Sequence, residues 1–224
     1  MMRIVLDARR GHVLRSDAHG MLVALDGPAN QYLLDAADSG RAVELAALCT
    51  GPDRVVSLMD ARYAPLLGAR EQDIFRCNTY VYHGGSKPDV VGGANGPARV
   101  GALELRALDE GALDVVCAHY APLPPEAVRH HLHAGWVFGG FDATGELVGF
   151  VGEHDEGSIG MLEVLPAHRR RGYAQALESF MINRHLAQGH TPYCQVEMAN
   201  AASHALQAKL GFTRLPGVQC WIEG

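Results

Sequence analysis

The sequence predicts a mixed α/β fold, in which helices flank a central, mostly antiparallel sheet and a smaller α/β lobe precedes it. In the second half of the chain, short apolar runs typical of strands alternate with segments of helical spacing. A segment rich in glycine and proline, 84–101, separates this half from the first residues. Hydrophobic content of 48% and charged content of 20% are typical of soluble globular proteins. We therefore expect an N-terminal lobe over 1–83, a linker over 84–101 and a larger domain over 102–224.

The first elements of the larger domain are predicted from caps, prolines and a turn. Asp109 can cap one helix, and the pair Pro124-Pro125 suits the first turn of another, which Gly135 ends. The DATG sequence at 142–145 predicts a hairpin between two strands. In order, we expect a strand over 103–107, helices over 108–120 and 124–135, strands over 136–141 and 146–152, and a strand over 159–165.

The later elements follow from helix ends. Gly189 ends a segment with one apolar side, and Asn200 is a good N-cap. Leu206 and Leu210 lie one turn apart on one helix face, and Gly211 is a plausible stop. We expect a helix over 172–188, a strand over 193–198, a helix over 201–210 and a last strand over 218–222. In the N-terminal lobe we expect strands over 21–25, 55–58 and 78–82 and a helix over 41–48.

Charge and cysteine usage exclude several classes of function. A net charge of −6 argues against broad binding to nucleic acid or to an anionic membrane. No apolar stretch approaches the length of a membrane span, and the N-terminus lacks the apolar core of a secretory signal. The cysteines are odd in number and scattered, so we expect reduced thiols and a cytoplasmic protein. They are Cys49, Cys77, Cys117, Cys194 and Cys220.

The most informative segment is LEVLPAHRRRGYA, which runs from Leu162 to Ala174. It predicts a strand, a proline stop, a basic turn and then the first turn of a helix. Backbone N–H groups at a helix N-terminus are unpaired, and the helix dipole favours an anion there. Gly172 has no Cβ, so a diphosphate can approach the backbone closely. The segment therefore predicts a pyrophosphate site.

Two motifs in this order resemble the GNAT acyltransferase superfamily. The first, Arg169-x-x-Gly172-x-Ala174, is similar to its acyl-CoA signature. The second, NAASHALQAKLGF over 200–212, is similar to the stretch that lies beside the cofactor's pantetheine arm. The resemblance covers about 102–224 and implies a GNAT fold with acetyl-CoA, or another acyl-CoA, as co-substrate and no metal. By element order alone, the first lobe resembles the degenerate lobe of glycine N-acyltransferase-like proteins.

The resemblance also implies roles for single residues. The backbone N–H of Val164 would stabilise the thioester oxyanion, and Leu165 would bond the pantetheine through its backbone. The remaining residues implied in cofactor binding are Arg169, Arg170, Arg171, Gly172, Tyr173, Ala174 and Asn200.

The proton-transfer residues are less well determined by the sequence. An amine acceptor is protonated at neutral pH, so a base or a water chain must remove a proton. Glu153 and Glu163, on the two central strands, are the leading candidates. His154, Glu197 and a water relay are the alternatives.

For the acid that protonates the leaving thiolate, the chain departs from the family. Many relatives have tyrosine where this chain has Gln207, which cannot act as an acid. Ser203, one turn earlier, could hydrogen-bond the sulfur, although it could equally bond the backbone. The group His130, His131 and His133 lacks a carboxylate or cysteine to complete a metal site.

The leading hypothesis is an acyl-CoA-dependent N-acyltransferase, with acetyl-CoA as donor and direct attack in a ternary complex. We expect a small-molecule or amino-acid-like amine as acceptor, with no nucleic acid and no membrane as partner. A homodimer is left open. The alternatives are a non-catalytic acyl-CoA sensor, which Gln207 favours, and an O-acyltransferase.

Overall fold

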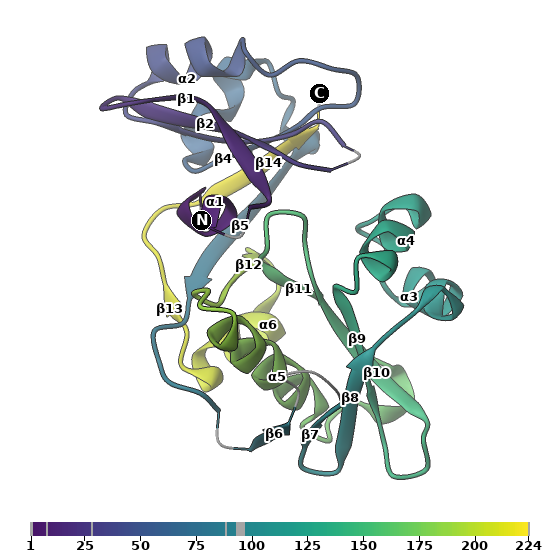
Figure 1. Ribbon diagram of the computed structural model, residues 1–224. Helices are drawn as coiled ribbons and strands as arrows, with labels where there is room; N and C mark the ends of the chain where they lie inside the picture. The colour runs from purple at the N-terminus through teal and green to yellow at the C-terminus, as the bar shows by residue number, and fades with distance from the viewer. Residues whose placement is uncertain (1, 8, 28, 88, 93–96, 224) are drawn as a thin grey trace.

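The computed structural model describes residues 2–7, 9–27, 29–87, 89–92 and 97–223. These residues form one 14-stranded sheet with helices on its faces (Figure 1). Neighbouring strands are antiparallel except for the pairs β3–β4 and β11–β12, which are parallel. The mixed, mostly antiparallel α/β fold predicted from the sequence is therefore confirmed. The strand order is β1-β2-β3-β4-β14-β5-β12-β11-β10-β9-β8-β7-β6, and β13 pairs with β5 beside this path.

The N-terminal lobe is built around a short helix, α2, packed on a sheet. Asp38 caps this helix, and its side chain accepts a hydrogen bond from the backbone N–H of Arg41. The elements are α1 (Met2–Asp7), β1 (Gly11–Asp17), β2 (Gly20–Leu25), β3 (Gln31–Ala36), α2 (Ser39–Ala46), β4 (Val55–Leu58), the 3-10 helices η1 (Ala61–Leu67) and η2 (Glu71–Asp73), and β5 (Ile74–Val81).

The second part of the chain places helices on both faces of its strands. Its elements are β6 (Val90–Gly92), β7 (Ala98–Val100), β8 (Leu103–Ala107), η3 (Glu110–Ala112), α3 (Leu113–His119), α4 (Pro125–His133), β9 (Val137–Phe141), β10 (Leu147–Glu153), β11 (Ile159–Val164), η4 (Pro166–His168), α5 (Tyr173–Ala187), β12 (Tyr193–Glu197), α6 (Ala201–Leu210), β13 (Thr213–Arg214) and β14 (Gln219–Glu223).

Strand β14 joins the two parts of the molecule. It pairs antiparallel with β4 on one side and with β5 on the other. Its residues Cys220 and Ile222 are buried in the core under α2. Figure 1 shows β14 and β5 running side by side from the second part of the chain into the N-terminal lobe. The last strand of the sequence is thus an internal strand of the first lobe.

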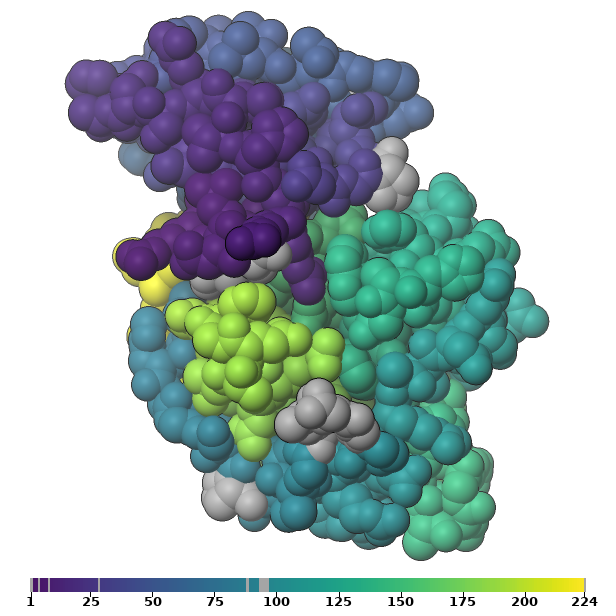
Figure 2. Space-filling model, in the orientation of Figure 1, coloured from purple at the N-terminus to yellow at the C-terminus, as the bar shows by residue number. Residues whose placement is uncertain are grey.

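Two hydrophobic cores pack the second part of the chain, one on each sheet face. The core under α5 and α6 includes Leu177, Phe180 and Leu210. The core under α3 and α4 includes Phe150 and Met161. The first lobe has two further clusters, and Figure 2 shows it stacked against the second part of the chain. The two faces of the central strands are thereby covered by different pairs of helices.

Several elements differ from the sequence prediction. Helix α1 and strands β1, β3, β6 and β7 were not expected, and β5 starts four residues before the predicted 78–82 strand, at Ile74. Strands β6 and β7 lie in the predicted linker, of which residues 88 and 93–96 are outside the described part. These elements have only three to seven residues each, which is too few for a clear periodicity. No helix in the described ranges combines the length and apolarity needed to cross a bilayer.

Candidate active site

Strands β11 and β12 are paired at one position only within the described residues, Ile159 opposite Cys194. On its other side, β11 pairs antiparallel with β10. Just beyond β11, Leu165 donates its N–H to the Val148 carbonyl at 2.9 Å. Successive N–H groups of a strand point to opposite edges, so the N–H of Val164 points toward β12. The edge of β11 beyond Ile159 can therefore pair with an extended ligand, as an exposed strand edge pairs with a peptide.

The backbone of Leu165 is engaged within the protein. Besides its bond to Val148, its carbonyl accepts the N–H of His168 at 2.8 Å, which closes the turn η4. A carbonyl has a second lone pair, so this oxygen is the backbone group of Leu165 that can still accept from a ligand. Val164 is the better placed main-chain donor of the two.

The N-terminus of α5 presents unpaired donors. Gly172 is its N-cap, with φ of 82°, and makes no side-chain cap bond. The first helical bond runs from the N–H of Ala176 to the Gly172 carbonyl at 3.2 Å. The N–H groups of Tyr173, Ala174 and Gln175 therefore precede the helical ladder. Together with the positive end of the dipole of this 15-residue helix, they form a site suited to a diphosphate.

Glycine at position 172 is required by backbone conformation rather than by space. A Cβ there would meet no heavy atom within 4 Å. The left-handed φ, however, is strained for other residues. Arg170 adopts a left-handed φ of 63° as well. Two residues of the turn that precedes α5, Arg170 and Gly172, thus have left-handed backbone conformations.

The three arginines of the turn have different surroundings. Arg169 donates from Nε to the Val164 carbonyl at 3.0 Å and from Nη2 to Oε1 of Glu163 at 2.8 Å. Arg170 and Arg171 are exposed. Glu163 is therefore ion-paired beside the proposed diphosphate site, and two arginines remain at the surface to meet phosphates.

Glu153 lies in a buried charge cluster. It is 2% exposed. It pairs with Arg10 of the N-terminal lobe, and its Oε1 lies 3.1 Å from Nε2 of His185 on α5. Burial alone would raise the pKa of Glu153, but the hydrogen bond to His185 and the charge of Arg10 lower it to about 2. A carboxylate held ionised in this way is a weak proton acceptor at neutral pH.

Helix α6 places its predicted site residues at two depths. Asn200 is exposed, and its Oδ1 accepts the N–H of Ser203 at 3.0 Å, so its side chain caps the helix. Ser203 is half-buried. Gln207, one turn further, is 2% exposed. The helix thus presents Ser203 and Gln207 on its inner face.

Gln207 contacts a buried carboxyl that sequence reasoning missed. Glu178 on α5 is 1% exposed. Burial raises the pKa of Glu178 to about 7, against a hydrogen bond with Gln207 that lowers it. Glu178 Oε2 and Gln207 Oε1 have no hydrogen-bond partner among the described atoms. Gln207, which stands where many similar proteins have tyrosine, is therefore paired with the carboxyl of Glu178. No local sequence pattern predicts this contact.

The middle histidine of the group at 130–133 is buried. His131 is 1% exposed, and its Nδ1 lies 2.6 Å from the Ala127 carbonyl. Its Nε2 lies 3.3 Å from Oδ1 of Asp155, in the loop between β10 and β11. Within the described residues no group of three or more metal-ligating side chains is found.

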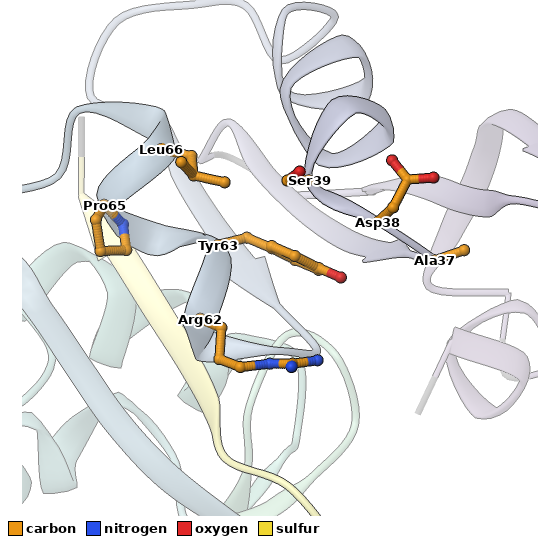
Figure 3. Close-up of a pocket in the computed structure, with 7 residues that line it drawn as sticks. All are labelled: Ala37, Asp38, Ser39, Arg62, Tyr63, Pro65 and Leu66. Atoms are coloured by element: carbon orange, nitrogen blue, oxygen red, sulfur yellow. The ribbon is translucent and has the colours of Figure 1, made fainter.

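A separate hollow of about 490 Å³ lies in the N-terminal lobe, between the start of α2 and η1 (Figure 3). The two charged side chains that line it have partners within the protein: Asp38 caps α2, and Arg62 pairs with Asp60 at 2.6 Å. The ring of Tyr63 lies between them and the apolar end at Leu66. The hollow therefore offers none of the donors found at α5.

Comparison with known proteins identifies a matching family model and structures of the same fold. Residues 137–222 match the model of the family described as FR47-like protein. No curated protein matches the chain. Among solved structures, a Drosophila protein superimposes with a TM-score of 0.65 at 20% identity, over 94% of this chain and 76% of its own length.

Two further structures carry GNAT in their descriptions. A GNAT-family acetyltransferase from Novosphingobium aromaticivorans has a TM-score of 0.59 at 20% identity, over 97% of this chain and 92% of its own. A tandem GNAT protein of clavulanic acid biosynthesis has a TM-score of 0.53 at 16% identity, over 93% and 81%. At these identities the likeness shows the fold. The family match is confined to 137–222, and nearly the whole chain has the fold of these GNAT structures.

Proposed function

We propose that the chain is an acyl-CoA-dependent N-acyltransferase that moves an acetyl group from acetyl-CoA to the amine of a small or amino-acid-like acceptor. The observation that carries this proposal is the continuous path from the unpaired edge of β11 to the open N-terminus of α5. An extended amide chain fits the first part, and a diphosphate fits the second. These are the pantetheine arm of coenzyme A, which carries the thiol, and the diphosphate at the other end of that arm.

The residues present fit that co-substrate. The N–H groups of Tyr173 and Ala174 would meet the diphosphate, with Arg170 and Arg171 at the surface beside it. The N–H of Val164 would stabilise the negative charge that develops on the thioester oxygen. The acceptor amine would then attack in a ternary complex, because the thiols of the described residues are poorly placed as acyl carriers: four are buried, Cys194 opposite Ile159 among them, and Cys117 lies on α3.

The N-terminal lobe contributes to the acceptor side of the molecule. Arg10 and Gln31 bond to Glu153, His154 and Asp155 at the junction of β10 and its following loop. We propose that this lobe narrows the space in which the acceptor binds and thereby selects its size.

The second candidate function is an acyl-CoA sensor without catalysis. The replacement of tyrosine by Gln207 favours it, because the chain then lacks the acid that many relatives use for the leaving thiolate. A thiolate with a pKa near ~8.5 leaves without a dedicated acid more readily than an alkoxide would. The missing tyrosine therefore reduces, but does not abolish, the expected rate.

Two measurements on the full chain test the proposal. Calorimetry with acetyl-CoA should give binding that Gly172→Ala weakens about 10-fold or more, a loss of about 1.4 kcal/mol, because alanine strains the left-handed turn that presents the donors. The matched control is Gly217→Ala, which has φ of 87° and open space but lies in another turn. Thiol release from acetyl-CoA should rise with at least one amine of a broad panel.

The outcomes separate the candidates. Binding without thiol release on any amine or alcohol would support the sensor. Release with alcohols alone would indicate an O-acyltransferase. Absence of binding, or an equal effect of Gly172→Ala and Gly217→Ala, would overturn the assignment of the diphosphate site.

A further inference from the structure

The imidazole of His154 lies against the backbone of Gly160. His154 directly follows β10, and Gly160 is the second residue of β11. A Cβ at Gly160 would overlap Nε2 and Cδ2 of the ring. The glycine therefore leaves room for the imidazole. Its neighbour Ile159 is the residue paired with Cys194, so the ring sits where β11 and β12 begin to part.

The position of this ring is fixed from several sides. The His154 N–H donates to the Ser158 carbonyl at 3.0 Å, and its carbonyl accepts from Nη1 of Arg10 at 3.0 Å. The Tyr120 hydroxyl, just after α3, lies 3.4 Å from Nε2. The same hydroxyl forms a hydrogen bond with the backbone of Met161, the residue after Gly160. The ring, the phenol and β11 thus form one connected group.

Burial keeps the ring neutral against the charge of Asp155. Tyr120 comes from the α3 side, His131 from α4, Arg10 from the N-terminal lobe and Asp155 from the same loop. Burial lowers the pKa of His154, and the charge of Asp155 opposes this only in part. Burial also raises the pKa of Tyr120 to about 12, so the phenol keeps its proton. A neutral imidazole has a lone pair available near neutral pH.

We propose that Nε2 of His154 is the base that receives the proton of the acceptor amine, with the Tyr120 hydroxyl as the relay between them. This proposal rests on the proposed transferase function. The Tyr120 hydroxyl gives its proton to Nε2 and takes one from the ammonium, and the free amine nitrogen forms the C–N bond to the thioester carbon. The C–S bond then breaks, and the thiolate takes up the second amine proton. His154 releases its proton to water, so products are the amide, free thiol and one proton.

The test uses the full chain, acetyl-CoA and an amine that the wild type accepts. His154→Gln should lower kcat/KM by about 10²-fold or more, the usual contribution of a positioned base. Calorimetry should show unchanged affinity for acetyl-CoA. Gly160→Ala should produce the same loss, because its methyl group would displace the ring. The controls are His119→Gln, an exposed histidine at the end of α3, and Gly85→Ala, which has open space.

Two further readouts separate a chemical role from a structural one. Added imidazole should restore part of the rate to His154→Ala and none to His119→Ala. Tyr120→Phe should lower kcat/KM about as far as His154→Gln does, because the relay to Nε2 is lost, and should leave the affinity for acetyl-CoA unchanged. A phenol that only fills space would leave kcat/KM unchanged.

The outcomes are distinct. If the wild type transfers acetyl and His154→Gln does so within about 3-fold of it, the base assignment is wrong and the transferase stands. If the wild type binds acetyl-CoA and acylates no acceptor, the transferase proposal fails and the base assignment fails with it. A rate that imidazole restores would confirm both.

Discussion

Arg10 of the N-terminal lobe forms a buried ion pair with Glu153, the last residue of β10. The side chains of the two residues are 16% and 3% exposed, and the guanidinium carbon of Arg10 also lies 4.3 Å from the ring centroid of Trp136. This pair connects residues 143 positions apart in the sequence and ties the two lobes together.

Removing either partner should destabilise the protein strongly. Arg10→Ala and Glu153→Gln should each lower the free energy of unfolding by about 3–5 kcal/mol, because each leaves a buried group uncompensated. The double variant should lose less than the sum of the two. Urea denaturation of the four proteins measures this coupling. Arg76→Ala, which breaks the more exposed Arg76–Glu71 pair, should cost about 1 kcal/mol or less. Additive losses would contradict a direct Arg10–Glu153 interaction.

Glu178 should make stability depend on pH in the opposite sense to an ordinary carboxylate. Its pKa is raised by burial from 4.5 to about 7, so the folded state keeps a proton that the unfolded state loses. Stability is then lost as pH rises from 4.5 to 7. Glu178→Gln should therefore raise the free energy of unfolding at pH 8 relative to pH 5 by about 2–3 kcal/mol. Exposed Glu126→Gln is the control. Equal effects at the two pH values would contradict a protonated Glu178.

Glu163→Gln should leave the reaction largely intact. The Glu163 carboxylate is paired with Arg169 at 2.8 Å, on the turn that leads to α5. We expect kcat/KM within about 3-fold of wild type, and a stability change of about 1 kcal/mol or less, the range of exposed pairs. Glu104→Gln, which breaks the Arg99–Glu104 pair elsewhere, is the matched control. A fall of about 10²-fold would identify Glu163 as the base in place of His154.

Gly149 controls how closely β10 and β11 approach. A Cβ at Gly149 would lie 2.5 Å from the Glu163 carbonyl oxygen and 3.0 Å from the Val164 Cα. Gly149→Ala should lower the free energy of unfolding by about 1–3 kcal/mol through overpacking. It should also slow transfer, because Val164 is displaced. Gly85→Ala, with no atom within 4 Å, should change neither. Unchanged thermal denaturation of Gly149→Ala would show that the strands have room to separate.

Local sequence signals were sufficient to predict most helices and strands in the second half of the chain. The strand predicted over 103–107 and the helix predicted over 201–210 have those bounds in the structure. Asn200 caps α6 as expected, and Gly211 ends that helix in the left-handed conformation. Asp109 instead caps the 3-10 helix η3, and α3 begins at Leu113, later than the helix predicted over 108–120. Caps, stops and turns act within a few residues, so a single sequence contains their full signal.

Long-range relations were beyond this kind of reasoning. The insertion of β14 between β4 and β5, the Arg10–Glu153 pair and the Glu178–Gln207 contact join residues from distant segments. No periodicity marks such partners. Glu153 illustrates the difficulty: a carboxylate at the end of a central strand suggests a base from its position, while its surroundings lower its pKa to about 2.

The place of β14 has a consequence for how the molecule is made. Residues 219–223 are synthesised long after β4 and β5, yet they fill the slot between these two strands. Until β14 has been made, the first lobe has two open strand edges, which are prone to pair with other chains. A chain cut short before residue 219 would therefore lose an internal strand of its first lobe.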